Sequence, residues 1–384
     1  MYSLKFNASC SRGKTVWMIT SDNGIFEFDM DDTKVRYRKS VSMNSLGLHN
    51  RFSLLVYCNN LLILAPFNSG CFFIYDLKMD EIRELRGTKA GIAFVNYYVT
   101  DKKILFFSKD CRVIAVYEKE LELINFIDTA IKTKAQKENI GCVIHNGICL
   151  YKDCLYIVVP GTNELVSLSL FTLKIVKTGF VERVLKIPQS NIISVFEQND
   201  TFYYLLSDGS ICTGTPYKVK EKMDLPKNFK RGNLELNPFN NCIQNENCTV
   251  ISPYEANMAL MVKGNEVTEC FSSKDRRDSL GRKGYLAGTN VAIDKMIFFQ
   301  AQSGKAVVVD TKTGLSKAQM LDYSDKSVMN YFEEFVQKGD VLYEGNSGMQ
   351  LEDYIEYVMK KNASSVCVEK TEMCGRRIYM DTIR

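Results

Sequence analysis

Residues suited to catalysis are scarce in this chain of 384 residues. It has two histidines, His49 and His145, too few for a metal centre of three histidines or of two histidines and a carboxylate. None of its 13 cysteines has the Cys-x-x-Cys spacing of a zinc ribbon or a thioredoxin-type redox site. We therefore expect no metal site and no cofactor, and the sequence assigns no catalytic residue.

One segment has the residue types of a phosphate-binding loop. Residues 8–15 read Ala-Ser-Cys-Ser-Arg-Gly-Lys-Thr, a permissive P-loop match that lacks the first glycine. Such a loop requires a following helix, because the N–H groups at its N-terminus hold the phosphates. Residues 16–20 are instead Val-Trp-Met-Ile-Thr, typical of a strand, and a turn follows at Asp22-Asn23-Gly24. We therefore interpret the segment as a hairpin loop. The alternative is a nucleotide enzyme, which a strand at residues 15–20 would exclude.

The overall composition is that of an ordinary globular protein. The hydrophobic fraction is 46%, the charged fraction is 24%, and the net charge is +4. An odd number of cysteines without disulfide-type spacing favours a reducing compartment. The sequence shows no signal peptide and no apolar run long enough to span a membrane. We therefore expect a cytoplasmic protein without a membrane span.

The elements that must position any site form a weak repeat. Runs rich in Ile, Val, Phe, Tyr and Leu alternate with Gly, Asn, Asp and Ser turns, which indicates an all-β protein. A tight turn followed by a strand, often ending in an aromatic-acidic pair, recurs with turns at 24, 70, 110, 161, 209, 264 and 304. The mean spacing is about 47 residues, as expected for four strands per unit.

This pattern, as in Val309-Asp310-Thr311-Lys312-Thr313-Gly314, resembles the blades of the β-propeller superfamily, although WD-repeat and kelch signatures are absent. The resemblance covers residues 1–320 and implies a seven-bladed β-propeller of four-stranded antiparallel blades. The expected blades lie near 3–40, 52–87, 92–128, 146–180, 191–224, 247–273 and 285–320. The fourth strand of blade six is the least visible.

The period changes after residue 320. Val328, Phe332, Phe335 and Val336 share one helical face, and Leu351, Ile355 and Val358 form a second stripe. Residues 321–384 are therefore expected to be a helical extension packed on the propeller. The alternative is that these helices provide a docking or oligomerisation surface.

Charge is predicted to differ between the two faces of the ring. In a propeller, the connections between blades lie on one face together with the turns between the second and third strands of each blade. Basic residues gather in three such connections: Lys132, Lys134 and Lys137; Lys227, Lys230 and Arg231; and Arg276, Arg277, Arg282 and Lys283. Clustered positive charge attracts anionic partners. One alternative is that these basic residues only keep the loops exposed to solvent. Another is that the acidic C-terminal segment covers them.

The leading interpretation is a non-catalytic binding or scaffold module. Its basic loop face would take a protein or an anionic glycan, with nucleic acid less favoured, and the C-terminal helices offer a further contact. The alternative is a propeller enzyme, a lyase or hydrolase acting on a small or sugar-like substrate in the central pocket. Propeller enzymes of the streptogramin-lyase type place a catalytic histidine near the channel, which makes His145 the candidate under that alternative.

Overall fold

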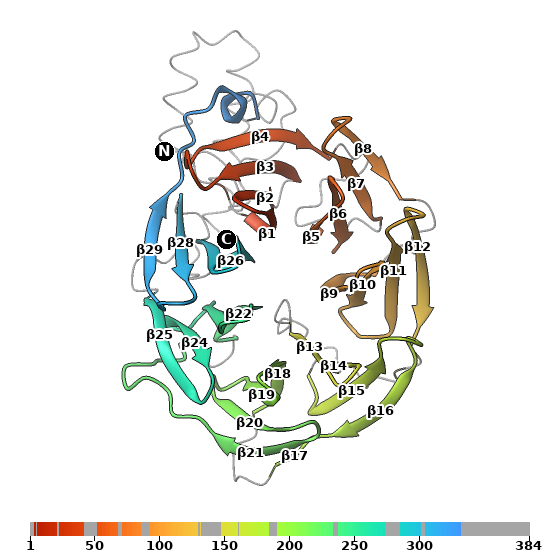
Figure 1. The fold of residues 1–384 in the computed structure, drawn as a ribbon, viewed down its shortest axis with the longest axis vertical. Coiled ribbons are helices and arrows are strands. Elements are labelled where there is room, and N and C mark those ends of the chain that lie inside the picture. The colour runs from red at the N-terminus through yellow and green to blue at the C-terminus, as the bar shows by residue number, and fades with distance from the viewer. Residues whose placement is uncertain are drawn as a thin grey trace, which may run out of the picture.

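The computed structural model describes thirteen stretches of the chain and forms a closed ring of seven blades (Figure 1). The described residues are 4, 6–20, 23–41, 52–67, 71–85, 92–129, 131, 147–159, 161–183, 190–232, 237–272, 285–300 and 304–331. Among them, no helix is long and apolar enough to cross a membrane.

Each blade is an antiparallel sheet of four strands consecutive in sequence. Blades 1 to 3 consist of β1 (Phe6–Arg12), β2 (Thr15–Thr20), β3 (Gly24–Asp29) and β4 (Val35–Ser40); β5 (Phe52–Cys58), β6 (Leu61–Pro66), β7 (Phe73–Asp76) and β8 (Glu81–Glu84); and β9 (Phe94–Val99), β10 (Lys103–Ser108), β11 (Val113–Glu118) and β12 (Leu123–Asp128). In each blade the first strand lines the centre of the ring and the fourth forms the outer rim (Figure 1).

The remaining four blades follow the same order. They are β13 (Ile148–Tyr151), β14 (Cys154–Val158), β15 (Glu164–Ser169) and β16 (Ile175–Phe180); β18 (Ile192–Gln198), β19 (Thr201–Leu206), β20 (Ile211–Thr215) and β21 (Lys218–Lys222); β22 (Phe239–Gln244), β23 (Thr249–Pro253), β24 (Met258–Lys263) and β25 (Glu266–Ser272); and β26 (Tyr285–Asn290), β27 (Lys295–Gln300), β28 (Lys305–Asp310) and β29 (Ser316–Met320). A short strand, β17 (Glu182–Arg183), adds to blade 5 in parallel with β21.

The aromatic-acidic repeat has a structural cause in the turn before each outer strand. In three blades the aspartate that ends the third strand, Asp29, Asp76 or Asp310, accepts hydrogen bonds from backbone N–H groups of the following turn. These bonds hold the pKa of Asp76 and Asp310 below the usual range. The aspartate therefore replaces the missing ladder partners where the strand ends.

Blade 6 begins at Phe239, not near residue 247 as the sequence suggested. Its first strand reads Phe-Asn-Asn-Cys-Ile-Gln, and its asparagines resemble a turn. The structure buries Asn241, Cys242 and Ile243; Cys242 packs in the cluster shared with blade 5, and Ile243 packs in the cluster shared with blade 7. Burial between blades, rather than local propensity, makes this segment a strand.

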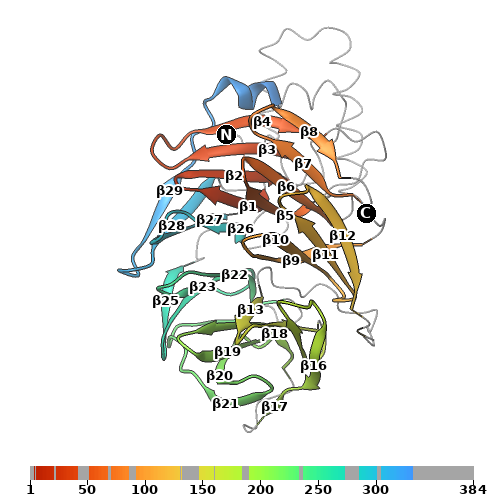
Figure 2. The ribbon, with the colours of Figure 1, turned by 45° about the vertical axis from the view of Figure 1, so that its right-hand side comes forward.

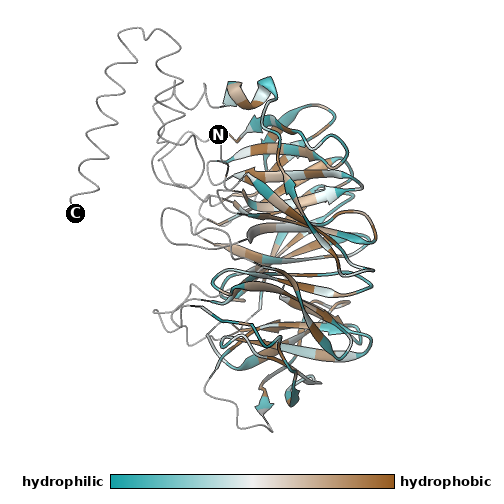
Figure 3. Ribbon diagram, turned by 90° about the vertical axis from the view of Figure 1, so that its left-hand side faces the viewer, coloured by the Kyte–Doolittle hydropathy of each residue, from teal (hydrophilic) through white to brown (hydrophobic). Residues whose placement is uncertain are grey.

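The hydrophobic core is divided into seven clusters, one at each junction between neighbouring blades. The inner strands are accordingly buried along most of their length, as β6 and β10 are, and Figure 3 shows the blades edge-on, coloured by hydropathy. Because each sheet buries its faces against the sheets on either side, a single blade has no complete core. Stability therefore depends on closing the ring.

The ring is closed by a segment that returns to blade 1 after β29, here called the strap (residues 321–331; Figures 1 and 2). The Val35 N–H donates to the Asp322 carbonyl over 2.8 Å, and the Asp322 N–H donates to the Thr33 carbonyl over 3.0 Å. This parallel pairing covers the edge of β4, much as β17 covers the edge of β21. The strap ends in a helix at 326–331.

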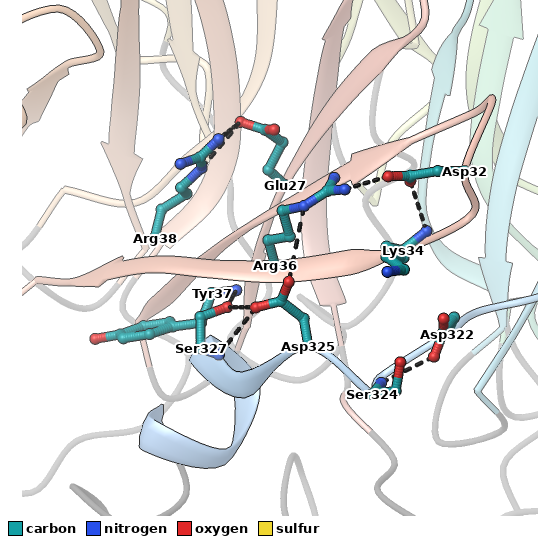
Figure 4. Close-up of polar contacts among 10 residues, drawn as sticks. All are labelled: Glu27, Asp32, Lys34, Arg36, Tyr37, Arg38, Asp322, Ser324, Asp325 and Ser327. Carbon is teal, nitrogen blue, oxygen red and sulfur yellow. Dashed lines mark hydrogen bonds and ion pairs between the residues drawn. The ribbon is translucent and has the colours of Figure 1, made fainter.

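Polar contacts fix the strap helix on β4 (Figure 4). Asp325 accepts hydrogen bonds from the backbone N–H and the hydroxyl of Ser327. Asp325 thereby caps the N-terminus of the helix. Arg36 forms ion pairs with Asp32 and, at 3.8 Å, with Asp325. The Ser327 hydroxyl also accepts the Tyr37 N–H at 2.9 Å. The helical segment expected after residue 320 is thus present and packs on blade 1 as far as residue 331; 332–384 lie outside the described residues.

Candidate interaction face and central channel

Connections between blades and the turns between second and third strands meet on one face, here called the loop face. Backbone hydrogen bonds join the two sets: the Val41 N–H donates to the Asn23 carbonyl, and the Met223 N–H to the Ile211 carbonyl. The Val181 N–H likewise donates to the Asn163 carbonyl. These contacts recur because each outer strand ends next to the turn that begins the third strand of its own blade.

The connection from blade 5 to blade 6, residues 223–232, is held firmly against the loop face. The backbone N–H of Lys230 donates to Asn257 Oδ1 at 2.7 Å, and the Asn257 N–H donates to the Lys230 carbonyl at 3.1 Å. Phe229 stacks on Phe239 with ring centroids 5.9 Å apart. The chain leaves this contact at Gly232, whose φ is +88° and where a Cβ would lie 2.2 Å from the Glu255 carbonyl oxygen. Only glycine fits there.

Three of the ten predicted basic residues lie in this connection. Lys227 and Lys230 are exposed, whereas Arg231 is half-buried and donates from Nε to the Ser207 carbonyl at 3.0 Å. Two carboxylates, Asp224 and Glu255, belong to the same region of the loop face. The other seven predicted residues lie outside the described residues: Lys132, Lys134, Lys137, Arg276, Arg277, Arg282 and Lys283. His49 and His145 lie outside them as well.

The centre of the ring carries a polar feature that sequence reasoning missed. Six of the seven innermost strands show a register shift near their start, at residues 7, 53, 95, 193, 240 and 286. In five of these strands, small polar residues occupy or follow the bulge: Asn7, Ser9, Ser53, Asn96, Ser194 and Asn241. An aromatic residue or isoleucine opens each of the six strands, at 6, 52, 94, 192, 239 and 285. That recurrence is the signal that would have located them.

Several of these polar side chains connect neighbouring blades. Ser53 of β5 donates its hydroxyl to the Phe94 carbonyl of β9. Asn96 of β9 accepts the Gly147 N–H of the next blade at 3.3 Å. A Cβ at Gly147 would lie 2.7 Å from the Ser194 hydroxyl, so the blades approach closely at this point. The polar residues therefore join the inner strands to one another.

The central channel contains a cavity of about 20 Å³, lined in part by Asn7, Ser9, Ser53, Tyr97, Asn241 and Gly288. This volume is close to the space that one water molecule needs. The residues that line it supply hydroxyls, amides and backbone groups, and none of them is a carboxylate or a histidine. Ser9 Oγ is buried with no hydrogen-bond partner among the described residues. The cavity therefore suits a water molecule rather than a sugar-sized substrate.

Buried thiols next to the channel lack the character of nucleophiles. Burial raises the pKa of Cys242 to about 12 and the pKa of Cys149 well above its usual value. A thiol of this kind stays protonated near neutral pH, and the thiolate is the reactive form. In the described ranges, no group of three or more His, Cys, Asp or Glu side chains is placed to hold a metal ion.

The segment that matches a P-loop forms a hairpin. Residues 8–12 belong to β1, Gly13 turns the chain with φ of +58°, and β2 begins at Thr15. Because a strand follows the glycine and lysine, no helix N-terminus is available to hold phosphates. Lys14 instead pairs with Asp31 at 2.8 Å. The nucleotide interpretation is excluded.

The ring of seven four-stranded blades defines the chain as a β-propeller. No protein-family profile and no curated protein matches its sequence. Solved propeller structures are similar in fold. Virginiamycin B lyase from Staphylococcus aureus has a TM-score of 0.56 and 11% identity over 78% of this chain and 92% of its own. A streptogramin B lyase structure has a TM-score of 0.56 and 12% identity over 78% and 91%.

A further similar structure belongs to a secretion system. PorZ, a surface component of the type-IX secretion system of Porphyromonas gingivalis, has a TM-score of 0.56 and 11% identity. The match covers 84% of this chain and 39% of PorZ. At such identities the similarity establishes the fold alone. Enzymes and a secretion component share this fold, so the fold does not select a function.

Proposed function

We propose that this propeller is a non-catalytic binding module whose loop face presents basic connections to an anionic macromolecule or glycan. The observation that carries the proposal is the connection at 223–232. Its backbone is tied to Asn257 and its Phe229 is packed on Phe239, while Lys227 and Lys230 project as exposed cations. A cation on a fixed backbone loses less entropy when it binds than one on a free loop.

The properties of the central channel support the non-catalytic half of the proposal. The cavity has room for about one water molecule, and hydroxyl, amide and apolar side chains line it. A lyase or hydrolase for a sugar-like substrate needs a larger pocket with groups that can transfer protons. Among the described residues, binding is therefore better supported on the loop face than in this cavity.

Direct binding to defined anionic probes tests this function. Fluorescein-labelled heparin, poly-glutamate and single-stranded DNA are each titrated against the full chain by fluorescence anisotropy at low ionic strength. Wild-type protein is expected to bind at least one probe, and Lys227→Glu/Lys230→Glu to bind it several-fold more weakly.

A matched control separates the loop face from general charge. Lys220→Glu/Lys222→Glu makes the same charge change on β21, at the outer rim of blade 5, where both lysines are exposed. This variant is expected to keep most of the affinity. Equal losses in the two variants would reject a role for the loop face, and no binding by wild-type protein would reject an anionic partner.

A further inference from the structure

Large exposed apolar side chains are concentrated on the rim of blades 3 and 4. Five side chains there are between 56% and 79% exposed: Leu121, Leu123, Phe171, Val176 and Phe180. They lie on or next to β12 and β16, which follow one another along the lower right of the ring (Figures 1 and 2). Single exposed apolar residues are ordinary, but five on two neighbouring outer strands form a patch of the kind that marks an interface. We call these five residues the rim patch.

The junction beneath the rim patch also differs from the two junctions that precede it in the chain. At the rim, ion pairs join blade 1 to blade 2 (Lys39 with Asp80) and blade 2 to blade 3 (Arg83 with Glu122). No ion pair joins the described residues of blade 3 to those of blade 4. Leu170 and Leu173, in the turn before β16, pack on the hydrophobic cluster at that junction, and Phe171 between them is exposed.

Among the described residues, no further strand pairs with the outer edge of β12 or β16. The strap covers the edge of β4, and β17 covers the edge of β21. β16 reads Ile-Val-Lys-Thr-Gly-Phe and carries no carboxylate. Exposed outer strands with apolar side chains favour pairing with another chain.

We propose that the rim patch is the contact through which two copies of this chain form a symmetric dimer. In a two-fold dimer, the same patch of each copy faces the other. The five side chains together expose on the order of 600 Å², so two copies would bury about 1,200 Å², the lower end of the range for stable specific interfaces.

The charges around the rim patch are compatible with self-association. Exposed residues near it are of both signs, with Lys174 and Lys177 on one side and Glu120 and Asp128 on the other. The rim patches of two copies can therefore face each other without strong repulsion between like charges. A mixed, weakly charged, apolar surface is typical of contacts between identical subunits.

Sedimentation velocity and light scattering on the full chain test the dimer. Wild-type protein is expected to be a dimer at micromolar concentration and to dissociate on dilution. Leu123→Arg/Phe171→Arg, which places charges in the rim patch at exposed positions, is expected to be a monomer at the same concentration. An unchanged circular dichroism spectrum and a cooperative thermal unfolding transition will show that the variant is folded.

The control is Ile293→Arg/Leu315→Arg in blade 7, where the side chains are 76% and 72% exposed. It is expected to leave the dimer intact. The proposal is wrong if wild-type protein stays monomeric up to high micromolar concentration. It is also wrong if the rim variant remains a dimer, or if the blade 7 variant dissociates as readily as the rim variant.

Discussion

The ring of Tyr331 lies against Gly24, which is 307 positions earlier in the chain: a Cβ on Gly24 would be 2.7 Å from Cε2 of that ring. Tyr331 also packs edge-to-face on Phe26, with centroids 4.9 Å apart. Position 24 therefore requires a glycine, because Tyr331 of the strap occupies the space that a side chain would need. The contact joins the end of the described chain to blade 1.

Changing Gly24 to Ala is expected to destabilise the fold by about 1–3 kcal/mol, because the added methyl would collide with Tyr331. Tyr331→Ala is expected to cost about 3–5 kcal/mol through the loss of a buried aromatic ring. Urea unfolding of both single variants and the double variant gives the coupling energy. The double variant should be more stable than the sum of the two losses implies, and strict additivity would contradict the contact.

Asp325 is expected to contribute both a helix cap and an ion pair. Asp325→Asn keeps an oxygen for Ser327 but removes the charge facing Arg36, so it should be less harmful than Asp325→Ala. Urea midpoints of the two variants measure the difference. Equal midpoints for Asp325→Asn and Asp325→Ala would show that the cap contributes nothing.

The same carboxylate predicts a pH dependence. Hydrogen bonds from Ser327, with a smaller effect of Arg36, hold the pKa of Asp325 below its ordinary value of 3.8. A depressed folded-state pKa stabilises the fold above the unfolded-state pKa, and that stability is lost as the pH falls through the folded-state pKa. Wild-type protein should therefore lose more stability than Asp325→Ala when the pH falls below about 4. Parallel pH profiles for the two proteins would contradict this.

Much of the fold could be predicted from the sequence because the turns before the third strands recur, and because Asp76 and Asp310 end those strands with residues that cap turns. Blade 6 was placed wrongly because Phe239–Gln244 is polar and becomes a strand only by burial between neighbours. The channel residues were missed because a bulge is set by strand pairing, and the only sequence signal is the aromatic residue or isoleucine that opens each bulged strand. The basic connection at 223–232 was recognised, but its anchoring through Asn257 depends on tertiary contacts.

Buried thiols are expected to be inert in the folded protein. Because burial raises the pKa of Cys242 to about 12 and that of Cys248 to about 11, these thiols should not react with Ellman's reagent at pH 8 until the protein unfolds. A raised folded-state pKa also means that stability is full below about pH 9 and declines as the pH rises from there. Thiol counts with and without urea check this, and rapid native reaction of Cys242, mapped by mass spectrometry, would contradict it.

The central claim is that the loop face binds an anionic partner, and heparin affinity against salt concentration tests it most directly. The loop-face variant, Lys227→Glu/Lys230→Glu/Arg276→Glu/Arg277→Glu, reverses four of the basic residues predicted from the sequence, of which the structure describes Lys227 and Lys230. The control, Lys174→Glu/Lys220→Glu/Lys222→Glu/Lys317→Glu, makes the same change in charge at exposed positions on the rim. The account predicts at least a tenfold weaker affinity, about 1.4 kcal/mol, and a shallower salt dependence for the loop-face variant alone. Equal affinities and salt dependences for the two variants would contradict it.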